Sequence, residues 1–474
     1  MRSRRPIAIG AGLEALGRRR KAAQTYRGSA LAVVSILVML GVLCFSVMLA
    51  PCSEAASAKN TDGVVKKVFA NGLTLLVKES QASDVVAVEL IVGMGAKFES
   101  DSEAGISRLL QQTMLKGTKT RGAEQIVNEI ESVGARINSG SNKEVGFIEL
   151  TCTKEGLEKA LEVFFDVIQN PAFPPEEVKK ERDLVVKRIK ERKDQPLGST
   201  IDLTQEALYG GHPFHKPGEG YEETVGGFER DDVARAYERF YVPENMVIAA
   251  VGNLDGKKLT ENINKRLGAL KKSGRKPVQE LPPVSLPESK ELVKNKQIAS
   301  AWIVIAYPTP GLSQEDYASV RVLDSVMGGG SMDSRLWAEL RDKKGLGYSI
   351  GSFTAGYSRD AFVGAYIGTR PDQYEIARDG ILNEFAKMRS DGITKEELEG
   401  AQKYLRGTYM IGLESNDSQA FTFGFYECVG VGFGFADRYP ELLLGVTRED
   451  VSRIANKYFQ NYALGTHLPE RKEN

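Results

Sequence analysis

The stretch Gly105-Ile-Ser-Arg-Leu-Leu-Gln-Gln-Thr-Met-Leu-Lys-Gly-Thr118 decides how the rest of this sequence is interpreted. Its apolar residues recur every three to four positions, which is the spacing of an amphipathic helix. They are Ile106, Leu109, Leu110 and Met114. The spacing therefore predicts a helix with one buried face. The opposite face carries the polar residues Arg108, Gln111 and Gln112.

Patterns typical of strands and helices surround this segment. Residues 65–78 alternate apolar and polar side chains about Asn71-Gly72, which predicts a β-hairpin. Apolar runs predict buried strands at 85–95 and 245–252, and a strand pair lies within 135–153. Further helices are expected at 123–133, 155–169, 175–193, 230–241 and 315–327, and further strands at 298–307 and 361–369.

Residues 271–291 lack apolar periodicity and are rich in Lys, Pro, Ser and Glu, as expected of an extended linker. The helix pattern of 230–241 recurs at 448–459, and that of 175–178 recurs at 395–398. Two matches in the same order at nearly one offset indicate a duplicated domain of roughly 200 residues. The sequence thus predicts an α+β protein with domains at 59–270 and 292–474 joined by the linker.

Residues 1–58 have the composition of a targeting segment. They hold eight basic and two acidic residues, and the segment 29–50 carries no charge. Ala-Ser-Ala at 56–58 is a small-residue cleavage pattern, which predicts a signal peptide and export to the periplasm or beyond. The uncharged segment is also long enough for a membrane anchor, and Cys52 offers a poorer lipoprotein signal because Pro51 precedes it.

Charge and cysteine content exclude some classes of protein. The formal net charge is zero, so the chain after residue 58, with 55 basic and 61 acidic residues, carries a net charge of −6. This acidic balance argues against a nucleic-acid partner. Cys44 and Cys52 lie in the leader, while Cys152 and Cys428 are expected to be buried thiols.

The Gly105–Thr118 stretch resembles the zinc-binding helix of the insulinase-like (M16) peptidases, whose pattern H-x-x-E-H precedes a tail ending in Lys-Gly-Thr. In this sequence Arg108 replaces the first histidine, Gln111 the catalytic glutamate and Gln112 the second histidine. The family's third ligand is a glutamate seven positions after a supporting glutamate. Glu181 matches the supporting position, and Arg188 stands at the ligand position.

These replacements remove the chemistry that the family pattern serves. A guanidinium has no lone pair to give to Zn²⁺, and an amide has no pKa suited to general acid or base catalysis. We therefore expect no metal and no catalytic residue in this chain. The resemblance also implies half of a clamshell: two of four α+β domains that enclose a peptide-sized chamber, with zinc in a partner chain only.

The second half carries two candidate substrate-binding features. Gly328, Gly329 and Gly330 lack the Gly-Lys-Ser/Thr ending of a P-loop, and a tight turn and a substrate-facing loop are both open interpretations. Arg341 and Tyr348 match, in spacing, a family pair that contacts bound peptide. Without the resemblance, a solvated arginine and a core tyrosine would be the simpler interpretation. In the first half, an edge strand near 138–141 is expected to pair with extended substrate.

The three histidines suggest no other metal site. His212 and His215 lie in a Gly- and Pro-rich segment that reads as a surface loop without a third ligand. His467 lies near the charged carboxyl terminus and receives no role.

The sequence thus predicts a non-catalytic, substrate-binding subunit of a two-chain M16-type zinc peptidase, paired with a chain that carries H-x-x-E-H. Two alternatives are open: a structural or scaffolding M16 homologue, and a homodimer that binds peptides without cutting them.

Overall fold

The computed structural model describes residues 61–274, 281–330 and 333–470, all within one compact unit. The predicted leader, with its segment 29–50 and its two cysteines, lies outside these residues. None of the helices in these ranges is long and apolar enough to cross a membrane. Cys152 and Cys428 are both buried, as predicted for them.

The first half of the described chain forms a six-stranded sheet in the order β1-β2-β6-β3-β5-β4. The predicted hairpin is confirmed, since β1 pairs with β2 in antiparallel register. The strands are β1 (Val64–Val68), β2 (Thr74–Glu79), β3 (Val85–Gly93), β4 (Arg136–Ser141), β5 (Val145–Thr153) and β6 (Met246–Gly252). The helices are α3 (Ile106–Thr113), α4 (Ala123–Glu131), α5 (Leu157–Gln169), α6 (Pro175–Asp194), α7 (Pro196–Tyr209), α8 (Glu222–Gly226), α9 (Arg230–Phe240) and α10 (Gly256–Leu267).

The second half repeats this topology. Its sheet runs β7-β11-β8-β10-β9, the same order as β2-β6-β3-β5-β4, so the predicted duplication and α+β class are confirmed. The strands are β7 (Lys290–Lys296), β8 (Ala301–Thr309), β9 (Ser349–Thr354), β10 (Ala361–Thr369) and β11 (Ala463–Pro469). The helices are α11 (Tyr317–Asp324), α12 (Tyr374–Ser390), α13 (Lys395–Gly412), α14 (Asn416–Cys428), α15 (Phe435–Gly445) and α16 (Arg448–Tyr458). Strand β8 starts three residues later than predicted, and β7 starts inside the predicted linker.

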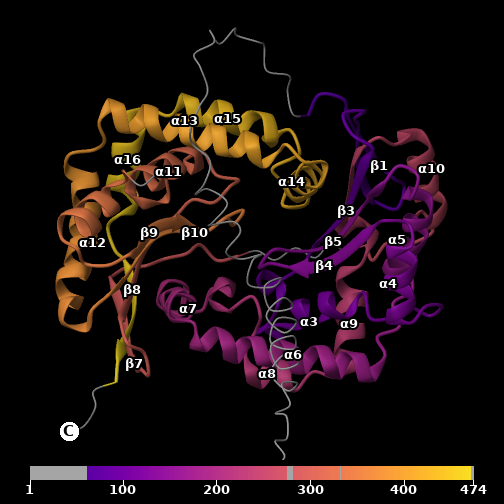
Figure 1. Ribbon diagram of the computed structural model, residues 1–474, viewed down its shortest axis with the longest axis horizontal. Helices are drawn as coiled ribbons and strands as arrows, with labels where there is room; N and C mark the ends of the chain where they lie inside the picture. The colour runs from indigo at the N-terminus through magenta and orange to yellow at the C-terminus, as the bar shows by residue number, and fades with distance from the viewer. Residues whose placement is uncertain (1–60, 275–280, 331–332, 471–474) are drawn as a thin grey trace, which may run out of the picture. The chain divides into compact units, whose positions relative to one another are not determined.

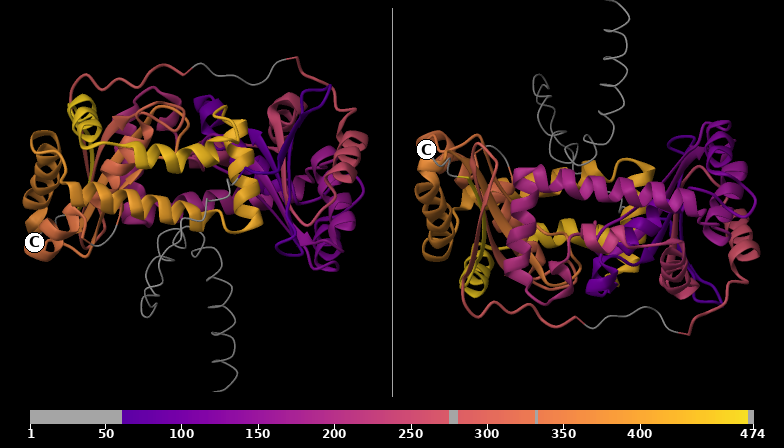
Figure 2. Two further views of the ribbon diagram at one scale, coloured as in Figure 1. Left: turned by 90° about the horizontal axis from the view of Figure 1, so that it is seen from above. Right: turned by 90° about the horizontal axis from the view of Figure 1, so that it is seen from below.

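The two halves exchange helices. Helix α14 packs on β3 and β6 of the first sheet, and α7 packs on β8 and β11 of the second (Figures 1 and 2). Asn416 Nδ2 donates to the carbonyl of Val85 at 2.8 Å, and Thr204 fills the space beside Gly465. The apolar core of the second half accordingly includes first-sheet residues such as Ile91 and Ala249. One face of the first sheet is therefore covered by the carboxyl-terminal half of the chain.

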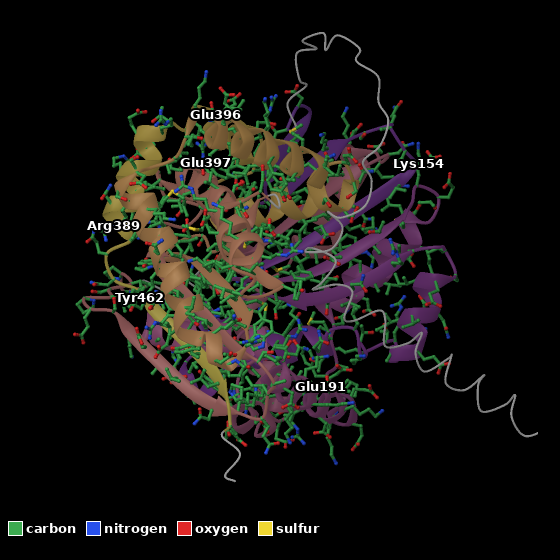
Figure 3. The ribbon with its side chains drawn as sticks, turned by 60° about the vertical axis from the view of Figure 1, so that its left-hand side comes forward. Lys154, Glu191, Arg389, Glu396, Glu397 and Tyr462 are labelled. Atoms are coloured by element: carbon green, nitrogen blue, oxygen red, sulfur yellow. The ribbon has the colours of Figure 1, made fainter. Side chains whose placement is uncertain are left out.

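Helix α13 shows how local sequence fixes an element start. Thr394 accepts from the Glu397 amide at 3.1 Å, and Glu397 accepts from the Thr394 amide at 2.8 Å. This reciprocal cap satisfies two donors at the helix start. Arg335 adds a bidentate ion pair to Glu397, at 2.7 Å to each oxygen. Figure 3 shows Glu397 at this end of the helix, among the charged side chains that cover the surface.

Candidate functional site

Helix α3, the predicted helix, is fixed at its start by a buried carboxylate. Glu99 accepts from the Gly105 amide and the Ser107 amide, both at 2.9 Å. These amides belong to the orphan donors of a helix start, where a negative charge is also favoured. Burial raises the pKa of Glu99, while these hydrogen bonds oppose that shift.

A tight loop crosses the start of α3. Gly220 has φ +80°, and a Cβ atom on it would overlap the Ala104 carbonyl and lie 2.7 Å from Gly105 Cα. Gly105 has φ +94°, and its Cβ would lie 2.6 Å from the Glu219 carbonyl oxygen. Two glycines back to back thus let the loop touch the helix start. This contact brings Glu219 to the polar face of α3.

Glu219 pairs with two of the four positions singled out from the sequence, and a third is joined to them through Arg188. Arg108 Nη2 lies 3.5 Å from Glu219 Oε1, and Arg188 Nε lies 3.6 Å from Glu219 Oε2. Arg188 Nη2 also donates to Gln112 Oε1 at 3.4 Å. Helix α6, which carries Arg188, packs directly on α3. Sequence reasoning missed Glu219, because a glutamate in a Pro-Gly-rich turn has no periodicity to mark it.

The cluster of Arg108, Gln112, Arg188 and Glu219, which we call the arginine cluster, has an excess of positive charge. One carboxylate faces two guanidiniums, and Nε of each arginine is buried without a hydrogen-bond partner among the described residues. Burial lowers the pKa of Arg108, Glu219 raises it, and the like charge of Arg188 lowers it. Arg108 nevertheless stays charged at neutral pH.

Gln111 does not join the cluster. It is fully buried, and its Nε2 donates to Tyr241 Oη at 2.8 Å and to Met94 Sδ at 3.2 Å. Its placement on the polar face, expected from the helix pattern, is therefore wrong. Helix α3 is buried on both sides because α6 and α9 pack on it together with β4.

The residues at this place do not fit Zn²⁺. The arginine cluster offers one carboxylate and one amide oxygen, whereas zinc sites use several thiolate, imidazole or carboxylate donors. The two guanidiniums would also repel a dication. The described residues contain no group of three or more His, Cys, Asp or Glu that could hold a metal.

We predict that the purified chain holds less than about 0.1 zinc per molecule after dialysis against micromolar zinc, because its donor set cannot satisfy the ion. Elemental analysis measures this directly, and a chelator should leave the unfolding temperature unchanged. One tightly held zinc per chain would contradict this prediction.

Arg341 and Tyr348 both lie near β9 but do not contact the arginine cluster. Arg341 belongs to a π-helical segment, Trp337–Lys343, and its guanidinium stacks 4.1 Å from the Trp337 ring centroid. Tyr348 is 91% exposed just before β9, so its alternative placement in the core is wrong. Among the described residues no hydrogen bond or ion pair joins the two. Both side chains are thus available to a ligand.

The three glycines are needed for close packing. They lie at the end of α11, where the segment Ser325–Gly329 is π-helical. A Cβ on Gly328 would lie 2.7 Å from the Ser352 amide, and one on Gly329 would lie 2.7 Å from the Asp324 carboxylate. This π-helical segment has none of the features of a P-loop, and its glycines are packed against neighbouring atoms. The glycines let β9 approach the helix that precedes Arg341.

The histidines occupy positions that the sequence did not suggest. His212 is buried, stacked on Tyr209 with ring centroids 5.4 Å apart, so its assignment to a surface loop is wrong. Burial lowers its pKa. His467 is buried on β11, where its Nδ1 lies 2.8 Å from Thr200 Oγ1, and burial lowers its pKa to about 4. Both rings serve packing in a neutral form.

Comparisons with known proteins identify the family of this chain. A family model described as "Insulinase (Peptidase family M16)" matches residues 74–219, and one described as "Peptidase M16 inactive domain" matches residues 227–405. The uncharacterized zinc protease YmxG of Bacillus subtilis is 28% identical over 400 residues, which cover 84% of this chain and 97% of that protein. An uncharacterized zinc protease of Mycobacterium leprae is 28% identical over 423 residues, covering 87% and 94%.

Solved structures share the fold. A protease from Helicobacter pylori matches with a TM-score of 0.80 and 21% identity, covering 86% of this chain and 99% of that one. A peptidase M16 inactive domain from Pseudomonas fluorescens matches with a TM-score of 0.79 and 21% identity, covering 87% and 99%. At this identity the likeness concerns the fold alone.

Proposed function

Because this chain belongs to the insulinase (M16) family of peptidases, we propose that it is the non-catalytic, substrate-binding subunit of a two-chain M16 peptidase. Its partner would carry H-x-x-E-H and the zinc ion. The observation that carries the proposal is the arginine cluster, in which arginines and a glutamine stand at the three ligand positions and hold one another around Glu219. A chain built this way cannot activate water for hydrolysis.

Arg341 and Tyr348 supply the binding role in this proposal. A planar guanidinium and a phenol hydroxyl donate hydrogen bonds to peptide carbonyls, including the one under attack in a partner's site. The Trp337 ring holds the Arg341 guanidinium in place, which lowers the entropy lost on binding. Tyr348 is almost fully exposed and needs no rearrangement to reach a ligand.

The proposed setting is the bacterial cell envelope. Residues 1–58 combine a basic start, an uncharged segment and a small-residue cleavage pattern, which together favour export. The subunit would then meet its partner and its peptides in the periplasm, as a free or membrane-anchored protein.

Co-expression with a zinc-motif M16 partner tests the proposal. We expect peptide hydrolysis only when both chains are present, and a loss of about 10-fold to 100-fold in kcat/KM from Arg341→Ala or Tyr348→Phe. Arg370→Ala is the matched control, since Arg370 is an exposed arginine paired with Asp372 near the end of a neighbouring strand. Unchanged activity from both variants, or zinc-dependent activity from this chain alone, would refute the proposal.

A further inference from the structure

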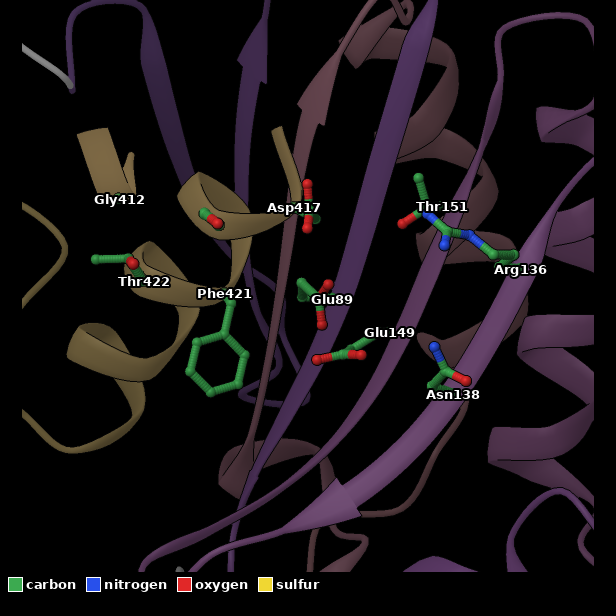
Figure 4. Close-up of a pocket in the computed structure, with 10 residues that line it drawn as sticks. Glu89, Arg136, Asn138, Glu149, Thr151, Gly412, Asp417, Phe421 and Thr422 are labelled. Atoms are coloured by element: carbon green, nitrogen blue, oxygen red, sulfur yellow. The ribbon is translucent and has the colours of Figure 1, made fainter. Parts of the chain in front are cut away.

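An acidic hollow of about 390 Å³ lies between the first sheet and α14. Glu89 of β3, Glu149 of β5 and Asp417 of α14 line it, and Figure 4 shows the three carboxylates turned toward one space. Asn138 of β4 completes the row. In the strand register Glu89 stands directly opposite Glu149, and Glu149 stands opposite Asn138. We call this space the acidic hollow.

Glu89 has no partner for its charge. The residue is 1% exposed, and its Oε2 is buried without a hydrogen-bond donor among the described residues. Burial raises the pKa of Glu89 well above its usual value, and Glu149 and Asp417 raise it further. Like charges directly opposite on paired strands destabilise a sheet. The arrangement therefore costs stability, and either protonation of Glu89 or a bound cation would relieve that cost.

The basic residue among the lining side chains does not neutralise this charge. Arg136 is exposed on β4 opposite Thr151, two residues along the register from the row of Glu89 and Glu149. No ion pair joins it to either glutamate. The hollow thus retains three carboxylates facing a space that a side chain can enter.

The hollow opens toward an edge of the sheet. Strand β4 ends the strand order, so its outer backbone groups are unpaired within the sheet. An extended peptide added there points alternate side chains to the face of the sheet that carries Asn138 and Glu149. Its backbone would lie two strand spacings, about 10 Å, from β5. An arginine or lysine side chain and Glu149 together span that distance, whereas Glu89 on β3 lies one strand spacing further, deeper in the hollow.

We propose that the acidic hollow binds the cationic side chain of a lysine or arginine in a peptide, with Glu89 as its most buried acceptor and Glu149 and Asp417 nearer its mouth. This inference rests on the proposed peptide-binding function and gives it a specificity. Other sides of the hollow fit the assignment: Phe421 of α14 supplies an apolar wall for the methylene stem of such a side chain.

Fluorescence anisotropy with neutral, extended peptides tests the inference. In one series a single lysine is moved along the peptide, and in the matched series norleucine replaces it. With the full-length chain we expect the best lysine peptide to bind about 10-fold more tightly than its norleucine counterpart. Glu89→Gln should reduce this preference to less than about 2-fold while leaving norleucine binding unchanged.

Glu149→Gln should act in the same direction, and Glu191→Gln, at an exposed site on α6, should leave the preference intact. Equal binding of lysine and norleucine peptides by the wild-type chain would overturn this inference and leave the proposed function standing. Absence of binding to any peptide would overturn both. Stoichiometric binding of calcium that depends on Glu89 would also overturn it, because the hollow would then be a metal site.

Discussion

Gly220→Ala should lower the free energy of unfolding by about 4 kcal/mol. Gly220 has φ +80°, where an alanine costs about 1–2 kcal/mol. Its Cβ would also overlap the Ala104 carbonyl and press on Gly105. Neither neighbour is a flexible side chain, so the backbone itself must move. The remaining cost is the strain of that shift, about 1–3 kcal/mol.

The backbone shift caused by Gly220→Ala should also disturb the arginine cluster. The loop that moves carries Glu219, the carboxylate shared by Arg108 and Arg188. Displacing it leaves two guanidiniums facing each other without a counterion, which adds to the loss. Urea unfolding followed by circular dichroism measures the total effect.

Gly63→Ala is the matched control. Gly63 has φ +79°, nearly the same as Gly220, but no heavy atom lies within 4 Å of the Cβ it would carry. It should lose only about 1 kcal/mol, the conformational part alone. An equal decrease in the free energy of unfolding for both variants would show that the close contact between the loop and the helix start does not contribute to stability.

Local pattern predicted much of this fold. The alternation about Asn71-Gly72 predicted a hairpin that forms, and the match of 230–241 to 448–459 predicted helices α9 and α16, which occupy equivalent places in the two halves. What local pattern could not show was the exchange of α7 and α14 between the halves. Each helix packs on a sheet distant in sequence, and periodicity reports a buried face without its partner.

The candidate site was predicted only in part, because helix periodicity does not show what packs on each face. A helix spacing placed Arg108 and Gln112 on one face, where Gln112 contacts Arg188 and Arg108 shares Glu219 with it. It placed Gln111 there too, but the residue points to Tyr241, because a helix that is packed on both sides has no solvated face. Glu89 did carry a signal. A single glutamate in the apolar run of 85–93 marks a carboxylate inside a buried strand.

Gln111 and Gln112 are adjacent on α3, and we expect a glutamine-to-glutamate substitution to affect stability in opposite directions at the two positions. Gln111→Glu should lower the free energy of unfolding at pH 8 by about 3 kcal/mol, because it buries a carboxylate without a cation. Among the hydrogen bonds of the described residues, the Gln111 side chain meets one hydroxyl, that of Tyr241, which could donate to the new carboxylate. Burial raises the pKa of Tyr241, so this phenol stays protonated and gives a single hydrogen bond.

Gln112→Glu should be neutral or stabilising by about 1 kcal/mol. Gln112 is partly exposed, and its Oε1 already accepts from Arg188 Nη2. A carboxylate there would share the excess positive charge of the arginine cluster with Glu219, in an environment where exposure limits the gain.

The pH dependence separates the two variants further. Burial would raise the folded-state pKa of a glutamate at 111 above its unfolded value of about 4.3. Such a group imposes no cost below the unfolded pKa, and its cost grows as the pH rises through the folded pKa. The deficit of Gln111→Glu should therefore shrink from pH 8 to pH 5, as measured by urea unfolding at both values. Equal stability of the two variants at pH 8 would contradict the assignment of Gln111 to the core. The expected contrast means that restoring a glutamate at 111 would not restore a general base, because its carboxylate would face Tyr241 and not the arginine cluster.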